Sequence, residues 1–112
     1  MKYMFLIYED DADRVAMTEE RMPNCSAYVQ AMTKAGIYVC GERLRGVTAA
    51  TTVRVTPSET HVVDGPYAEA KEQLGGFHVI DVPDLDTALA WAARCPSASR
   101  GAIEIRPVWP LE

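Results

Sequence analysis

Residues 3–8, "YMFLIY", are apolar at every position, and this run restricts the fold more than any other feature of the chain. Six apolar residues are too few for a membrane span or for the core of a signal peptide, so they predict a β-strand. Successive strand residues point to opposite faces of a sheet. One face would carry Met4, Leu6 and Tyr8, and the other Tyr3, Phe5 and Ile7. Both faces of the sheet therefore need an apolar cover.

The rest of the chain predicts two helical regions and five further strands. The first helical region should comprise a turn near 18–22 and a main helix that begins around Pro23 and stops at Gly36. A second helix is expected over 84–95, with Asp84 as its N-cap. Its buried stripe would be Leu85, Ala88, Leu89, Ala92 and Cys95. The expected strands are 37–42, 51–56, 60–64, 76–82 and 102–108, with 51–56 and 60–64 paired as a hairpin.

Without the hairpin the order of elements is βαββαβ, the ferredoxin-like α+β plan, in which two helices cover one face of an antiparallel sheet. The second face then needs a cover from outside the chain. A homodimer that packs two sheets face to face, as a dimeric α+β barrel, is the simplest solution. A large apolar ligand is the alternative.

Length and charge exclude several classes of protein. The 112 residues predict one domain over 1–112. The net charge is −5 and the 11 basic residues are scattered, whereas proteins that bind nucleic acid present a clustered basic face. We expect no direct nucleic-acid contact and no membrane segment. The wide spacing of Cys25, Cys40 and Cys95 predicts reduced thiols in a cytoplasmic protein, rather than disulfides or a zinc site.

The segment "HVVDGPYAEAKEQLGGF", residues 61–77, concentrates the candidate catalytic residues. Asp64 stands at the end of a strand beside a rigid Gly-Pro turn, where it could act as a general base or anchor a ligand. The structural alternative is that Asp64 caps the turn by accepting a backbone N–H. The pair Gly75-Gly76 is too short for a phosphate loop and predicts a bulge or a close backbone approach.

The chemistry of Glu69, Lys71 and Glu72 depends on the conformation of this segment. In a helix, Glu69 and Glu72 would share a face and form a two-carboxylate site. In an extended chain, Glu69 and Lys71 would share a face and could orient a polar substrate. A solvated loop with weak ion pairs is the third possibility.

Outside this segment, the candidates are His78 and a close pair of cations. His78 lies in a predicted strand and could be a general base in a cleft between subunits, or a satisfied core or interface residue. Arg43 and Arg45 could bind an anionic group or balance the acidic segment, and the second interpretation is favoured. The sequence contains no clustered histidines and cysteines, so no metal or other cofactor is expected.

The stretch "DGPYAEAKEQLGGFHVIDVPDLDTALAWAARCP" resembles the YCII-related family, in its DGPF-domain branch, where the motif runs Asp-Gly-Pro-Phe-Ala-Glu-Thr-Lys-Glu. This chain departs from that motif at Tyr67 and Ala70. The resemblance extends to "MKYMFLIYED", "AGIYVCGERL", "ATTVRV" and "AIEIRPV". It implies a ferredoxin-like fold and a dimeric α+β barrel. The histidine–aspartate dyad proposed in other members takes its histidine from the first helix, which has none here.

These observations lead to two functional hypotheses. In the first, a small cytoplasmic homodimer binds a small polar molecule in a pocket lined by Asp64, Glu69, Lys71 and Glu72. These residues would support acid–base chemistry, if any, and Tyr67, His78 and Arg43 would contact the ligand. In the second, implied by the resemblance, the protein is a regulatory module that acts through a sigma-factor partner. The sequence leaves open whether the protein is an enzyme.

Overall fold

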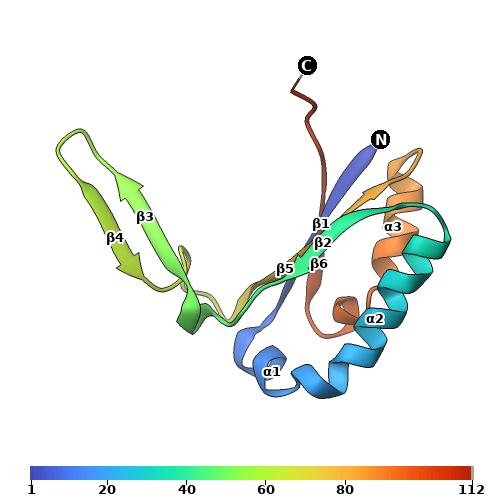
Figure 1. The fold of residues 1–112 in the computed structure, drawn as a ribbon, viewed down its shortest axis with the longest axis horizontal. Coiled ribbons are helices and arrows are strands. Elements are labelled where there is room, and N and C mark those ends of the chain that lie inside the picture. The colour runs from blue at the N-terminus through green and yellow to red at the C-terminus, as the bar shows by residue number, and fades with distance from the viewer. Residues whose placement is uncertain (112) are drawn as a thin grey trace.

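The computed structural model describes residues 1–111, and Figure 1 shows their arrangement. The elements in chain order are β1 (Lys2–Asp10), α1 (Asp11–Ala16), α2 (Thr18–Lys34), β2 (Tyr38–Arg43), the 3₁₀ turn η1 (Val47–Ala49), β3 (Thr51–Val55), β4 (Thr60–Asp64), β5 (Glu72–Asp81), α3 (Leu85–Ala93), the 3₁₀ turn η2 (Pro96–Ser99) and β6 (Ala102–Pro107). None of the helices in this described part is long and apolar enough to cross a membrane.

Four strands form one antiparallel sheet in the order β2-β5-β1-β6. With the hairpin set aside, this is the strand order of a ferredoxin-like βαββαβ fold, so the predicted fold class is confirmed. Strands β3 and β4 pair only with each other and form a hairpin that projects away from the sheet (Figure 1). The inserted hairpin is thus also confirmed.

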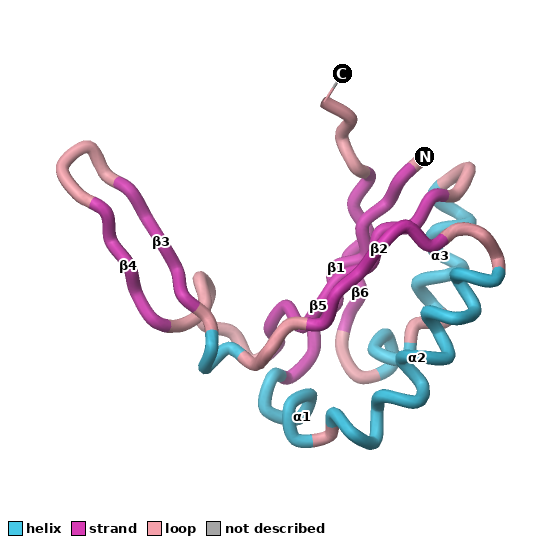
Figure 2. Tube along the Cα trace, viewed as in Figure 1, coloured by secondary structure: helices cyan, strands magenta, loops and turns pink. Residues whose placement is uncertain are grey.

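The core lies between the helices and one face of the sheet, as Figure 2 shows for α2 and α3. Phe5, Met32 and Ile80 are fully buried there. The burial of each of these side chains stabilises the fold by roughly 1.5–3 kcal/mol. Tyr3 and Ile7 join Phe5 on this face of β1, as the alternation of residues predicted.

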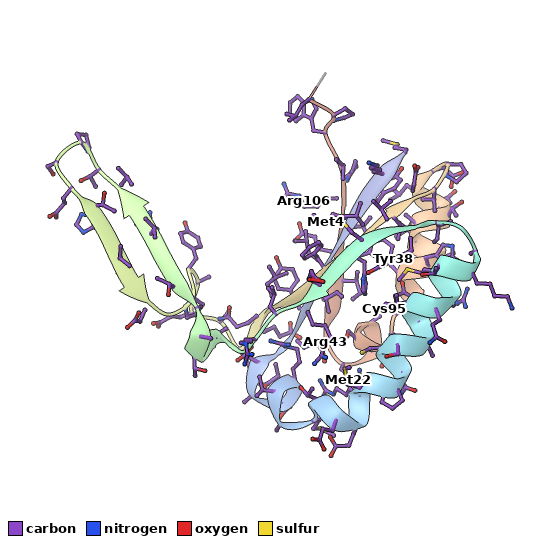
Figure 3. All side chains as sticks on the ribbon, in the orientation of Figure 1. Met4, Met22, Tyr38, Arg43, Cys95 and Arg106 are labelled. Atoms are coloured by element: carbon purple, nitrogen blue, oxygen red, sulfur yellow. The ribbon has the colours of Figure 1, made fainter. Side chains whose placement is uncertain are left out.

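The opposite face of the sheet carries the second apolar set. Met4 pairs with Val79 and Arg106, and Leu6 pairs with Phe77, so their side chains share a face. Figure 3 shows Met4 and Arg106 on the side away from the helices. We call this surface the open sheet face: Met4, Leu6, Tyr8, Cys40, Phe77 and Val79. No helix covers it within residues 1–111 (Figure 2).

The first helical region breaks at a different residue from the one predicted. Helix α1 ends and α2 begins around Met17, whereas Pro23 lies inside α2, so the expected break at Pro23 is wrong. One proline near the N-terminal end removes a single helical N–H donor, and the buried Tyr28 and Met32 further along hold the helix to the core. Gly36, at φ 77°, ends the helix as predicted.

Helix α3 confirms its predicted cap and part of its predicted stripe, including the buried Cys95. The carboxylate of Asp84 accepts hydrogen bonds from the hydroxyl and the backbone N–H of Thr87, and these bonds lower the pKa of Asp84. Ala88 and Ala92 are buried, but Leu85 and Leu89 are about half exposed. The small alanine face is the one that packs on the sheet, which turns the two leucines outward.

Candidate ligand cavity

A cavity of about 450 Å³ lies between α2 and the helix-side face of the sheet. Its walls come from β1, α1, α2, β2, β5 and η2, so no single segment of the chain contains it. Figure 3 shows Met22, Arg43, Tyr38 and Cys95 around this space. We call it the α2–sheet cavity.

One end of the α2–sheet cavity is aromatic. His78 of β5 lies edge-on to Tyr28 of α2, with ring centroids 5.9 Å apart, and to Tyr38 of β2, at 5.8 Å. The Tyr28 hydroxyl donates to the Trp91 carbonyl at 2.7 Å, which ties α2 to α3. Burial raises the pKa of Tyr28, so its hydroxyl stays protonated. These rings form a wall on which a flat molecule can stack.

His78 is the titratable group of this aromatic end. Its Nδ1 is buried and has no hydrogen-bond partner among the described residues. Burial lowers the pKa of His78, so the imidazole is neutral at pH 7. The neighbouring Gly41 must be glycine, because a Cβ there would lie 2.4 Å from Nδ1. Within the described residues, the imidazole is thus packed in the core with Nδ1 unsatisfied.

We expect His78 to make the protein less stable in mild acid. Its pKa is about 6.5 in the unfolded chain and lower in the folded protein. Below pH 6.5 the unfolded state therefore binds a proton that the folded state does not, and stability is lost as pH falls. Urea unfolding at pH 7 and pH 5 should show a steeper loss for the wild type than for His78→Phe. Equal losses in the two proteins would contradict this prediction.

The other end of the cavity is charged and is organised by Glu9. The Glu9 side chain is only 6% exposed, and Arg21 of α2 donates to it at 2.6 Å. The Ser97 hydroxyl of η2 donates to its second oxygen at 2.7 Å, and Arg100 approaches the first at 3.4 Å. One buried carboxylate thus joins β1, α2 and the segment after α3.

Arg14 closes the cavity beside the bulge in β5. Its guanidinium donates to the carbonyl of Leu44 at 2.8 Å and approaches Asp11 at 3.4 Å. The register of β1 and β5 shifts opposite Gly75, where a Cβ would lie 2.6 Å from the Arg14 Nε. The Gly75-Gly76 pair is therefore a bulge with a close approach, as predicted.

Comparison with known proteins identifies the family of this chain. The family model of the YCII-related domain matches residues 1–112. The chain belongs to the YCII-related family. It is also 40% identical to an uncharacterised protein of Rhizobium meliloti, over 96% of this chain and 92% of that one.

A solved structure confirms the fold of this YCII-related protein. It is similar to 5-chloro-2-hydroxyhydroquinone dehydrochlorinase from Burkholderia phenoliruptrix AC1100, solved in complex with 2,5-dihydroxybenzoquinone. The match has a TM-score of 0.58 and 12% sequence identity, and it covers 97% of this chain and 94% of the other. At this identity the likeness establishes a shared fold.

The structure divides the predicted site residues of the YCII-related chain into two groups. His78 and Arg43 both line the α2–sheet cavity. Asp64, Glu69, Lys71, Glu72 and Tyr67 are exposed and do not line it. Within residues 1–111, no three His, Cys, Asp or Glu side chains converge as a set of metal ligands.

The segment that connects the hairpin to β5 is irregular, which excludes the helical arrangement of Glu69 and Glu72. Among the described residues, neither Glu69 nor Lys71 forms an ion pair. The Gln73 amide holds the segment instead, by donating to the carbonyls of Ala68 and Ala70 at 2.8 and 2.9 Å.

The turn after β4 is held by its backbone rather than by Asp64. The Gly65 N–H donates to the Ala50 carbonyl, and the Thr52 hydroxyl donates to the Gly65 carbonyl, both at 2.8 Å. Gly65 has φ 117°, a conformation that glycine tolerates and other residues avoid. The Asp64 carboxylate accepts no hydrogen bond from a described residue, so the alternative in which it caps the turn is wrong. Beside this turn, the guanidinium carbon of Arg54 lies 5.0 Å from the centroid of the Tyr67 ring.

The cavity residues that sequence reasoning missed are Glu9, Arg14, Arg21, Tyr28, Tyr38 and Arg100. Glu9 did carry a signal, because it continues the odd-numbered set of β1 that faces the helices. A carboxylate in a buried row of side chains needs hydrogen-bonding or charged partners. This requirement identifies Glu9 as a candidate for a buried polar site. Arg21 and Arg100 carried no comparable signal.

Proposed function

We propose that this YCII-related protein binds a small, ring-sized molecule in the α2–sheet cavity, with His78 as its hydrogen-bonding partner. The observation that carries the proposal is a cavity of about 450 Å³ whose aromatic wall includes the imidazole of His78, which forms no hydrogen bond with the described residues. Ligand sites are concave and mostly apolar, with a few polar groups that fix orientation. The aromatic and charged ends of this cavity fit that description.

The neutral state of His78 sets the chemistry that the cavity supports. A neutral imidazole can accept a proton from a hydroxyl on a bound ring and return it later in a reaction. Tyr28 and Tyr38 flank His78 and would keep such a ring in position. The similar dehydrochlorinase binds dihydroxybenzoquinone, which supports a flat, oxygenated ring as the kind of ligand that this fold accommodates.

A thermal-shift screen of ring compounds tests the proposal, with Cys25→Phe as the blocking variant. Cys25 lines the cavity from α2, so phenylalanine at this position fills the space a ligand needs. Ala27→Phe is the matched control, because Ala27 is exposed on the same helix and does not line the cavity. We expect a hit that raises the Tm of the wild type and of Ala27→Phe but not of Cys25→Phe.

His78→Phe should weaken binding of a hydroxyl-bearing hit about tenfold, since it removes a hydrogen bond worth roughly 1–1.5 kcal/mol. Hits that remain unaffected by Cys25→Phe would place binding elsewhere, and a screen without hits would count against the proposal. Isothermal titration calorimetry supplies the affinities.

We further propose that the protein is a homodimer that pairs two open sheet faces. The apolar row of β1 on this face has no cover within residues 1–111, and a second copy offers the same surface in return. The β3–β4 hairpin projects on the side of the sheet away from the helices, which is the side of the open sheet face (Figure 1). Asp64, Glu69, Lys71 and Glu72 would then border the partner copy, and any site they form would be shared between subunits.

A further inference from the structure

The lining of the α2–sheet cavity carries an excess of positive charge. Four arginines line it: Arg14, Arg21, Arg43 and Arg100. The buried carboxylate among the lining residues is Glu9. Glu42 also belongs to the wall, but it pairs with Phe77, so its side chain lies in the row of the open sheet face. The wall of the cavity is thus positively charged, whereas the whole chain has a net charge of −5.

Three of the four arginines are accounted for by acidic partners. Arg21 and Arg100 share Glu9, and Arg14 is paired with Asp11. Arg43 forms no ion pair with any residue in the described part of the chain. Its guanidinium instead contacts the sulfur of Met22.

The contact between Arg43 and Met22 is one that a ligand can replace. A thioether is a weak acceptor, whereas a guanidinium binds a carboxylate through two strong, charge-assisted bonds. Methionine is flexible and moves aside at low cost. Arg43 is exposed at the end of β2 and still lines the cavity, so it lies at the opening, where an entering anion would meet it first.

Two further donors, which have no partner among the described residues, belong to arginines of the cavity wall. The Nε atoms of Arg14 and Arg21 are both buried and bond to no described residue. A buried N–H without an acceptor is costly. An anion in the cavity would therefore meet the guanidinium of Arg43, which has no acidic partner within residues 1–111, at the opening and arginines with unsatisfied N–H groups further in.

We infer that the ligand of the α2–sheet cavity is an anion, a carboxylate or an enolate on a planar ring, and that Arg43 is the residue that binds its charge. This inference rests on the proposed function, since it names the class of molecule that occupies the same cavity. The ring would lie against Tyr28, Tyr38 and His78, and the charged oxygens would face the arginines.

Benzoate and benzamide form a matched pair of probes, because they have the same ring and shape but differ in charge. Calorimetric titration of the wild type should show benzoate binding at least about tenfold more tightly, as expected for one charge-assisted contact. Arg43→Gln should remove this preference by weakening benzoate binding much more than benzamide binding. Arg45→Gln is the control for net charge, because Arg45 is exposed and does not line the cavity.

Three outcomes would overturn the inference. These are a wild type that binds benzamide as tightly as benzoate, an Arg43→Gln variant that keeps the preference, and an Arg45→Gln variant that loses it equally. Failure of both probes at millimolar concentration would also overturn the anion assignment. The proposed function would fall only if the wider screen of neutral and charged rings also gave no hit that Cys25→Phe blocks.

Discussion

Replacement of Glu9 by glutamine is expected to lower the free energy of unfolding by about 3 kcal/mol, as for other buried ion pairs that lose one partner. The carboxylate of Glu9 is the common acceptor for Arg21, Ser97 and Arg100. An amide of the same shape keeps the packing but leaves two guanidinium groups close together without a counter-charge. The change should separate η2 and α2 from β1 before it disturbs the rest of the sheet.

Urea unfolding at pH 7, followed by circular dichroism, measures this loss. Glu104→Gln is the matched control, because Glu104 is half exposed and lies 3.8 Å from an exposed Arg106. Exposed pairs of this kind contribute about 0–1 kcal/mol. Losses of equal size in the two variants would show that the Glu9 network does not hold the cavity together.

Replacement of Leu6 by glutamate is expected to convert a dimer into a folded monomer. Leu6 lies in the middle of β1, opposite Phe77 on the open sheet face. A carboxylate placed in the centre of an apolar interface has no partner there, and its burial costs several kcal/mol in each subunit. The helix-side core of the monomer does not contain Leu6, so the fold should survive.

Size-exclusion chromatography with light scattering at micromolar concentration measures the change in mass, and circular dichroism checks the fold. Leu89→Glu is the matched control, because Leu89 is about half exposed on α3, on the helix side of the sheet. We expect this control to remain dimeric. A monomeric wild type, or a Leu6→Glu variant that keeps the mass of a dimer, would contradict the proposed interface.

The strands of this YCII-related protein could be predicted to within a few residues, because strand periodicity acts locally, although β5 begins at Glu72 rather than at residue 76. The two residue sets of β1 do lie on opposite faces, and the odd set faces the core. The helix ends at Asp84 and Gly36 were also predictable, since a side-chain cap and a left-handed glycine depend on a few neighbouring residues. Packing changed the helices: Pro23 was accommodated inside α2, and α3 turned its alanines rather than Leu85 and Leu89 to the sheet.

The candidate site was less accessible to sequence reasoning, because its parts are distant along the chain. The segment 61–77 signals the family resemblance, but its charged residues Glu69, Lys71 and Glu72 lie outside the α2–sheet cavity. His78 and Arg43 were recognised as candidates. Their common cavity was not, since it exists only where α2 crosses the sheet.

By itself, the sequence determined the strands, their two faces, the main helix caps and hence the ferredoxin-like plan, because each depends on contacts within a few residues or on a fixed period. Only the tertiary structure decided where the α2–sheet cavity lies and which side chains line it. Glu9 meets Ser97 across 88 residues and Arg100 across 91, and His78 meets Tyr28 and Tyr38 from different elements. These contacts depend on how the helices pack on the sheet. A local pattern of residues does not predict that packing.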